Sequence, residues 1–229
     1  MPSADWIARL PRQRLLAEYS MWSADLIRLA DDLARIAPHA DLLHVDVADG
    51  HFAPALLFFP DLVARMRSVT ELPIHVHLMV ADAVLLSQVE QFADAGADLI
   101  SIHVESAAVA DAALAMIAAR GLAAGMVARV ETPVARLAPY LDRIDFLTLL
   151  GTAIGVKGQG LDPTAGDRLR EAGALIASSG RDIVLAADGG IRDNTVPLLR
   201  AAGAQTVVMG SLAFGAPDLV ARMAWLHAL

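Results

Sequence analysis

The feature that most constrains this chain is an eight-fold alternation of short apolar runs with longer segments of helical spacing. The runs are continuously apolar rather than alternating, which is typical of parallel strands buried on both faces. Repetition of strand, helix and strand implies parallel pairing through right-handed crossovers. We expect the strands at 15–20, 42–47, 74–79, 99–104, 123–127, 146–150, 183–187 and 206–209.

The segments between these runs have the spacing and the end signals of helices. The turns AGAD and AGAQ each place a glycine after the last helical residue and just before a strand, where a helix commonly ends. For the first helix we expect Ser23 to be the N-cap. Its apolar face would consist of Leu26, Leu29, Ala30 and Leu33.

Eight such units in 229 residues favour a single (β/α)8 TIM barrel, in the α/β class, over an open doubly wound sheet, which is the alternative. We expect residues 1–14 to be an N-terminal extension and residues 15–229 to be the catalytic barrel. In the extension, Trp6 and Leu10 would cover the bottom of the barrel or a neighbouring subunit. In such barrels the chemistry lies at the carboxyl ends of the strands.

Composition excludes several classes of function. Hydrophobic residues make up 56% of the chain, but no run is long enough to span a bilayer, so we expect no membrane partner. A formal charge of −8 with a single lysine argues against nucleic acid. The absence of cysteine fits a reducing cytoplasm, and it means that any metal must be held by histidine and carboxylate. The absence of an unbroken apolar stretch near the start argues against an export signal.

Polar side chains interrupt the apolar strands at their carboxyl ends. In LLHVDVADGH, His44 and Asp46 share one strand face, and in PIHVHLM so do His75 and His77. Asp188 follows the seventh run. Taken singly, each residue has a structural explanation as a hydrogen-bonded histidine or a turn-forming aspartate. Together they predict a site that contains nitrogen and oxygen ligands.

Four motifs, in order and at barrel spacing, give the chain its resemblance to the ribulose-phosphate 3-epimerase family: YSMWSADL, HVDVADGHFAP, HVHLM, and ADGGI followed by VVMGSLAF. The resemblance implies one divalent ion (zinc, iron or manganese) held by His44, Asp46, His77 and Asp188. It also implies that Asp46 and Asp188 are the two acid/base residues of an epimerase acting beside a keto group. A metal ion would stabilise the enediolate as a Lewis acid.

The same resemblance implies that the substrate is a small ketose phosphate. Its phosphate would lie after the seventh and eighth strands, in the usual phosphate region of these barrels. Ribulose 5-phosphate is one candidate, and a related pentulose, hexulose or tetrulose phosphate is another. We also expect a cytoplasmic homo-oligomer. The predicted substrate contacts are Ser20, His77, Met79, Gly155, Gly158, Gln159, Gly189, Gly190, Gly210 and Ser211.

The sequence departs from the family pattern around the pocket. Ala48 and Leu150 stand where methionines are usual, and His75 replaces the aspartate of DVHLM. The loop AIGVKGQ replaces a proline-containing phosphate loop and introduces Lys157, which would either reach the phosphate or be a solvated charge. We expect the reaction type to be kept and the substrate preference to differ from that of ribulose 5-phosphate enzymes.

Three other functions remain as alternatives. A decarboxylase of this barrel class would need a lysine in a barrel strand, and the only lysine lies in a loop. A metal-free aldose–ketose isomerase could use Glu105 and His103 but lacks a partner lysine. A non-catalytic sugar-phosphate sensor should lose metal ligands or acid/base residues, which this chain keeps.

Overall fold

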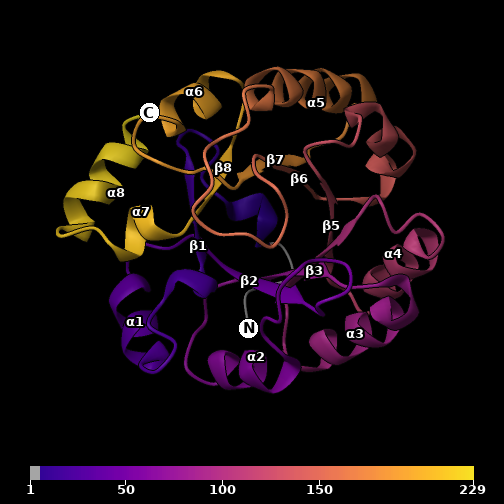
Figure 1. Ribbon diagram of the computed structural model, residues 1–229, viewed down its shortest axis with the longest axis horizontal. Helices are drawn as coiled ribbons and strands as arrows, with labels where there is room; N and C mark the ends of the chain where they lie inside the picture. Colours follow the sequence, from indigo (N-terminus) through magenta and orange to yellow (C-terminus); the bar gives the residue numbers. More distant parts are fainter. Residues whose placement is uncertain (1–5) are drawn as a thin grey trace.

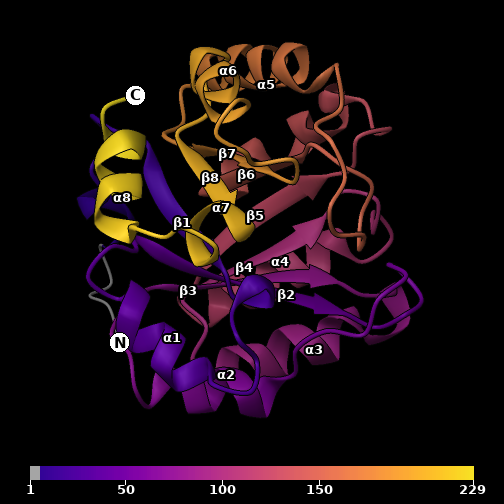
Figure 2. The same cartoon turned by 60° about the vertical axis from the view of Figure 1, so that its left-hand side comes forward.

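The computed structural model describes residues 6–229, and these form a closed ring of eight parallel strands surrounded by helices (Figures 1 and 2). Every strand pairs with its neighbours in chain order, and β1 closes the ring against β8. This confirms the TIM barrel and excludes the open sheet. The strands are β1 (Leu16–Ser20), β2 (Leu42–Ala48), β3 (Ile74–Met79), β4 (Leu99–His103), β5 (Ala123–Ala128), β6 (Phe146–Leu150), β7 (Val184–Asp188) and β8 (Thr206–Met209).

The helices cover the outside of the ring. Gly96 and Gly203 have positive φ angles of 96° and 107° directly after helices, as the AGAD and AGAQ turns predict. A 3-10 helix with Pro139 inside it connects β5 and β6. The helices are α1 (Leu29–Ile36), α2 (Pro60–Arg67), α3 (Asp82–Asp94), α4 (Ala110–Ala119), α5 (Ala165–Ser179), α6 (Val196–Ala201), α7 (Ser211–Phe214) and α8 (Leu219–His227), with 3-10 helices η1 (Ile7–Arg9), η2 (Met21–Ser23) and η3 (Val134–Arg143).

The start of the first helix differs from the prediction. Ser23 ends η2 rather than capping α1, which begins at Leu29. The intervening residues form a turn in which Asp25 accepts a hydrogen bond from the backbone N–H of Ile27, while its own N–H donates to Asp32. Local side-chain hydrogen bonds of this kind compete with helix formation. The prediction that Ser23 is the N-cap of the first helix is therefore wrong.

The barrel interior is built in layers. The bottom layer is apolar and includes Leu16, Leu42, Leu99 and Phe146, against which Leu10 packs. Leu10 therefore covers the bottom of the barrel, and Trp6 and Ile7 pack beside it. The division of the chain at residue 15 stays a prediction, and residues 1–5 of the extension lie outside the described residues.

The layer above is polar, although its side chains are buried. It contains Glu18, His44, His75 and Ser101. Because burying a polar group without a partner is costly, such a layer persists only when its members bond to one another. The polar layer lies between the apolar floor and the carboxyl ends of the strands, where the candidate site lies.

Candidate functional site

A cavity of about 330 Å³ opens at the carboxyl ends of the strands, within the range of small-molecule sites. Both predicted acid/base residues and all ten predicted substrate contacts line it. The wall consists of Ser20, Trp22, Ser23, Asp46, His77, Met79, Leu150, Thr152, Ala153, Ile154, Gly155, Val156, Lys157, Gly158, Gln159, Asp188, Gly189, Gly190, Ile191, Arg192, Val208, Gly210 and Ser211.

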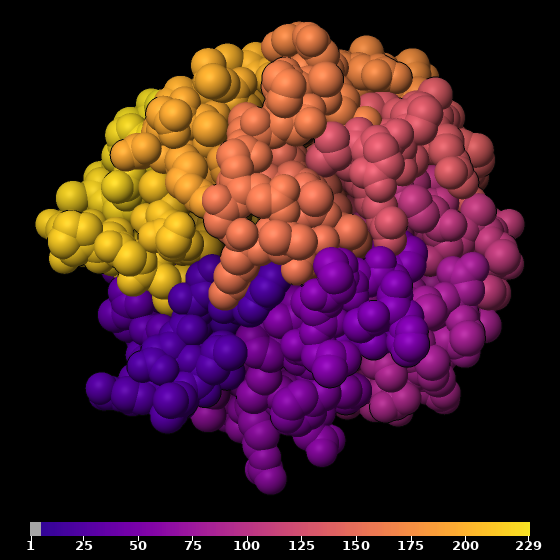
Figure 3. Space-filling view, in the orientation of Figure 1, coloured from indigo at the N-terminus to yellow at the C-terminus, as the bar shows by residue number. Residues whose placement is uncertain are grey.

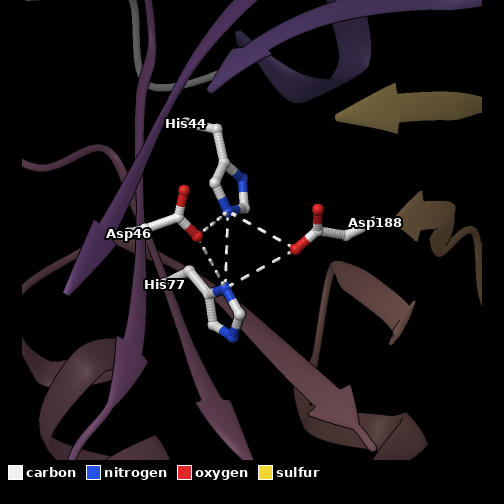
Figure 4. A group of neighbouring side chains, drawn as sticks. All are labelled: His44, Asp46, His77 and Asp188. Carbon is white, nitrogen blue, oxygen red and sulfur yellow. Dashed lines mark hydrogen bonds and ion pairs between the residues drawn. The ribbon is translucent and has the colours of Figure 1, made fainter. Parts of the chain in front are cut away.

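Four side chains converge at the inner end of this cavity (Figure 4), and Asp46, His77 and Asp188 line it, whereas His44 is fully buried behind them. His44 and Asp46 point inward from β2, and strand register places His77 of β3 beside Asp46. Asp188 is the last residue of β7. In Figure 4 the two aspartates approach from opposite sides, with the two histidine rings between them.

The spacing of the donor atoms suits a single ion. Oδ1 of Asp46 lies 3.2 Å from Nε2 of His44 and 3.4 Å from Nδ1 of His77, and these two nitrogens are 3.4 Å apart. Oδ2 of Asp188 lies 4.0 and 3.9 Å from the same nitrogens. Ligand atoms around a tetrahedral zinc ion are about 3.3–3.6 Å apart, given bonds of about 2.0–2.2 Å. His44, Asp46 and His77 have nearly this spacing, and Asp188 lies somewhat further out. The four residues therefore have the donor types and the proximity to hold a divalent metal ion.

The two aspartates differ in their affinity for a proton. Burial would raise the pKa of Asp46, but the charges and hydrogen bonds of His44 and His77 hold it below its usual range. For Asp188, burial outweighs the opposing effect of His44, and the Asp46 charge adds to it, so its pKa rises to about 6. In the metal-free site Asp188 therefore holds a proton more readily than Asp46 does. Such a difference between neighbouring carboxyl groups is typical of acid/base pairs.

The ring nitrogen of His77 that points away from the four-donor cluster, Nε2, contacts a chain of polar side chains. Nε2 of His77 lies 2.8 Å from Nε2 of His103, whose Nδ1 lies 3.0 Å from Oε2 of Glu105. Glu105 also accepts a hydrogen bond from the hydroxyl of Thr132. Burial lowers the pKa of His103 to about 4, so this ring is neutral. Neither His103 nor Glu105 lines the cavity, which argues against the isomerase in which they would act on the substrate.

Glu18, which the sequence analysis did not single out, supports the outer nitrogen of His44. It is fully buried in the middle of β1, and its Oε1 lies 2.7 Å from Nδ1 of His44 and 2.5 Å from Nδ1 of His75. Burial would raise the pKa of Glu18, but the charges of His75 and His44 keep it below its usual range. The signal was available, since a charged residue in a strand buried on both faces requires a partner.

The loop between β6 and α5 covers one side of the cavity and is attached to the segment after β1. Nζ of Lys157 lies 2.5 Å from the carbonyl oxygen of Trp22 and 4.5 Å from the centre of its indole ring. In Figure 3 the orange surface of this loop lies across the centre of the molecule's face. Lys157 thus lines the cavity while bonded to Trp22, and Arg192 adds a second positive side chain to the wall.

The apolar part of the wall differs from the expectation for Ala48. Met79 and Leu150 line the cavity, but Ala48 does not. Ala48 is buried in a small cluster with Ala53 and Met79, against which Ile154 packs. The smaller side chain at position 48 therefore leaves no open space beside the substrate region.

Two of the predicted phosphate-region glycines are also required by packing. Both have positive φ, and a Cβ on Gly189 would lie 2.3 Å from Oγ1 of Thr152. A Cβ on Gly190 would lie 2.7 Å from the backbone of Leu161. These glycines let the loop after β6 lie directly against the end of β7, so their backbone forms part of the cavity wall.

Solved structures with the same architecture show how widely this fold is shared. Orotidine 5'-phosphate decarboxylase from Pyrococcus horikoshii superimposes with a TM-score of 0.66 at 12% identity, covering 93% of this chain and 97% of that one. A 3-hexulose-6-phosphate synthase gives 0.63 at 16% identity, covering 93% and 96%. At these identities the likeness shows the fold alone. Within residues 6–229, no helix has the length and apolar character needed to cross a membrane.

Sequence comparison is more specific. The model of the "Ribulose-phosphate 3 epimerase family" matches residues 16–214. The ribulose-phosphate 3-epimerase of Escherichia coli K12 is 38% identical over 90% of this chain and 92% of its own length, and that of Bacillus subtilis is 33% identical over 87% and 92%. A Cupriavidus necator protein, ribulose-phosphate 3-epimerase 2, is 38% identical over 87% and 84%. From the family match and these relatives, the chain belongs to the ribulose-phosphate 3-epimerase family.

Proposed function

We propose that this protein is a metal-dependent 3-epimerase of a ketose phosphate. The observation that carries the proposal is that Asp46 and Asp188 line a cavity and face each other across a four-donor cluster at its inner end, with pKa values displaced in opposite directions. Inverting the carbon beside a keto group requires removal of a proton on one face and delivery on the other. Two carboxyl groups on opposite sides provide that arrangement.

The metal would be held by His44, Asp46, His77 and Asp188, and when bound it supplies a Lewis acid that stabilises negative charge on the enediolate oxygens. In one direction the ionised Asp46 takes the proton from the substrate carbon, and Asp188 donates its proton to the opposite face. In the other direction the two carboxyl groups exchange these parts. Ser20 donates a hydrogen bond of 2.9 Å to Asp46, which orients the carboxylate toward the cavity.

The phosphate group would lie at the end of the cavity formed by the turns after β7 and β8. Gly189, Gly190, Gly210 and Ser211 bring backbone close to that region, as in other barrels of this type. The remaining contacts would come from the covering loop, through Gly155, Gly158 and Gln159. Met79 would pack beside the carbon chain, and His77 beside the reacting oxygens.

Ribulose 5-phosphate is the first substrate to test, because the relatives at 33–38% identity are named for it. Metal-reconstituted protein should be assayed with ribulose 5-phosphate and with tetrulose and hexulose phosphates, following deuterium wash-in at C3. We expect exchange at C3 together with inversion for one of these ketose phosphates. A metal-loaded protein that exchanges no C3 proton in any of them would overturn the proposal and favour a sugar-phosphate sensor.

We also propose a cytoplasmic location and self-association. The lack of cysteine fits the first. Large apolar side chains exposed after β1 and β2 support the second, including Ile27 at 95% and Leu56 at 81% exposure. Light scattering after size exclusion, with Ile27→Glu as the variant, tests self-association. A monomer at micromolar concentration would contradict it.

A further inference from the structure

The polar layer, which shares His44 with the four-donor cluster, contains a buried carboxylate that takes no part in the proposed chemistry. Glu18 lies inside the barrel with no exposed surface and does not line the cavity. A carboxylate in this position is costly unless hydrogen bonds satisfy it. Its Oε1 meets two histidine rings, and its Oε2 lies within reach of the hydroxyl of Thr206 at 3.5 Å.

Glu18, His44 and His75 also have the composition of a metal site, but their distances indicate hydrogen bonds. The two nitrogens lie 2.7 and 2.5 Å from one carboxylate oxygen. Ligands of a common ion are held about 3 Å apart or more, whereas charge-assisted hydrogen bonds have the shorter lengths seen here. This group is therefore a network that supports the four-donor cluster rather than a second metal centre.

The network determines which nitrogen of His44 carries a proton. A carboxylate only accepts hydrogen bonds, so Nδ1 of His44 must donate to Glu18. This leaves Nε2, which faces Asp46 at 3.2 Å, as the nitrogen directed toward the ion. We infer that Glu18 is a positioning residue that fixes the tautomer and ring orientation of the metal ligand His44, with His75 as the second donor that holds the carboxylate in place. The inference rests on the proposed function, because it assigns His44 to the metal.

His75 is itself fixed on its far side. Its Nε2 lies 2.6 Å from Oγ of Ser101, and a Cβ at Gly125 would come within 1.9 Å of that same oxygen. Only glycine at 125 therefore leaves room for the hydroxyl. His75 is the departure from the DVHLM pattern noted in the sequence. The structure shows that it accompanies a carboxylate on the other side of His44.

Strand register suggests a rescue experiment. His44 pairs with Ser20 of β1 on one side and with His75 of β3 on the other, and the His44 and His75 rings lie 4.8 Å apart. A carboxylate introduced at 75 would thus lie beside the same ring as Glu18. The double variant Glu18→Ala/His75→Asp transfers the carboxylate from one neighbouring strand to the other.

The test uses full-length protein, with zinc affinity measured by chelator competition and ligand geometry by the absorption spectrum of the cobalt form. Glu18→Gln keeps the shape but removes the charge, and we expect zinc affinity to fall about 10–100-fold with an altered cobalt spectrum. The zinc affinity of Glu18→Ala should fall at least as far. The double variant Glu18→Ala/His75→Asp should recover most of the lost affinity. Glu90→Gln, the same change on the exposed face of α3, should leave both readouts unchanged.

Unchanged zinc affinity and cobalt spectrum in Glu18→Gln would overturn the inference, as would failure of the double variant to exceed Glu18→Ala. If the single variants do not fold, nitrogen-15 NMR of the zinc-loaded parent decides. We expect a strongly downfield, slowly exchanging proton signal from Nδ1–H of His44. The absence of this signal would also overturn the inference. None of these readouts needs turnover. If the unsubstituted protein binds zinc in a Glu18-dependent way but exchanges no substrate proton, the proposed function is contradicted and the inference about Glu18 stands.

Discussion

Nε2 of His77 and Nε2 of His103 lie 2.8 Å apart, so one of these nitrogens donates a hydrogen bond and the other accepts it. If Nδ1 of His77 binds the metal, its proton must be on Nε2, and His103 is the acceptor. His103 then keeps its own proton on Nδ1, where Glu105 accepts it at 3.0 Å. A neutral His103 agrees with its lowered pKa of about 4.

This relationship predicts that His103→Leu weakens metal binding. Leucine would leave the N–H of His77 buried without a partner, which costs about 1–3 kcal/mol, and loss of such support typically lowers metal affinity about 10–100-fold. Chelator competition and thermal unfolding measure the two effects. His103→Gln retains a carbonyl acceptor and should be the milder variant. Equal effects of leucine and glutamine would argue against the hydrogen bond as the cause.

The two aspartates should be separable by isotope exchange. Asp46→Asn and Asp188→Asn should each lower kcat by about 10²–10⁴-fold, because each removes one proton-transfer group. Each should also abolish exchange on one face of the carbon and weaken metal binding, while the fold is retained. Deuterium wash-in with each epimer as the starting substrate gives the readout. Near-normal turnover in either variant would contradict the two-base scheme.

Metal affinity should increase with pH. In the metal-free protein the pKa of Asp188 is raised to about 6, and that of His44 is raised above its usual value by Asp46 and Glu18, which outweigh burial. An ion competes with the protons held on these groups, so raising the pH favours binding, by about tenfold per pH unit for each proton that is displaced. The dependence should be steepest below pH about 6, where both groups are protonated. Equal zinc affinity at pH 5 and 7 would count against this ligand assignment.

The Lys157–Trp22 contact should affect substrate capture more than chemistry. Lys157→Met removes a cation–π contact worth about 0.5–1 kcal/mol at an exposed site, and with it a positive charge in the cavity wall. We expect KM for the ketose phosphate to rise several-fold, with a smaller change in kcat. Trp22→Leu keeps the positive charge and should have a smaller effect in the same direction, and combining the two should add little to Lys157→Met. Fully additive effects in steady-state kinetics would show that the two residues act independently.

Much of this protein is determined by local sequence. The predicted strand limits at 74–79, 146–150 and 206–209 coincide with β3, β6 and β8, because a continuous apolar run between turn signals reflects only its own burial. Alternation along a strand likewise predicted that His44 and Asp46 share a face, and the structure brings both together with His77 and Asp188. The start of α1 was missed, since side-chain hydrogen bonds around Asp25 decide it rather than apolar spacing.

Only the tertiary structure determines which side chains meet between strands that are distant in sequence. Nothing in LLAEYS shows that Glu18 meets His44 and His75, because that contact depends on the register of β1 against β2 and on closure of the barrel. The raised pKa of Asp188 similarly depends on its burial inside the closed barrel, and then on the charges of His44 and Asp46. Periodicity fixes which way a side chain points, whereas its partners, proton affinity and charge depend on groups that barrel closure brings near.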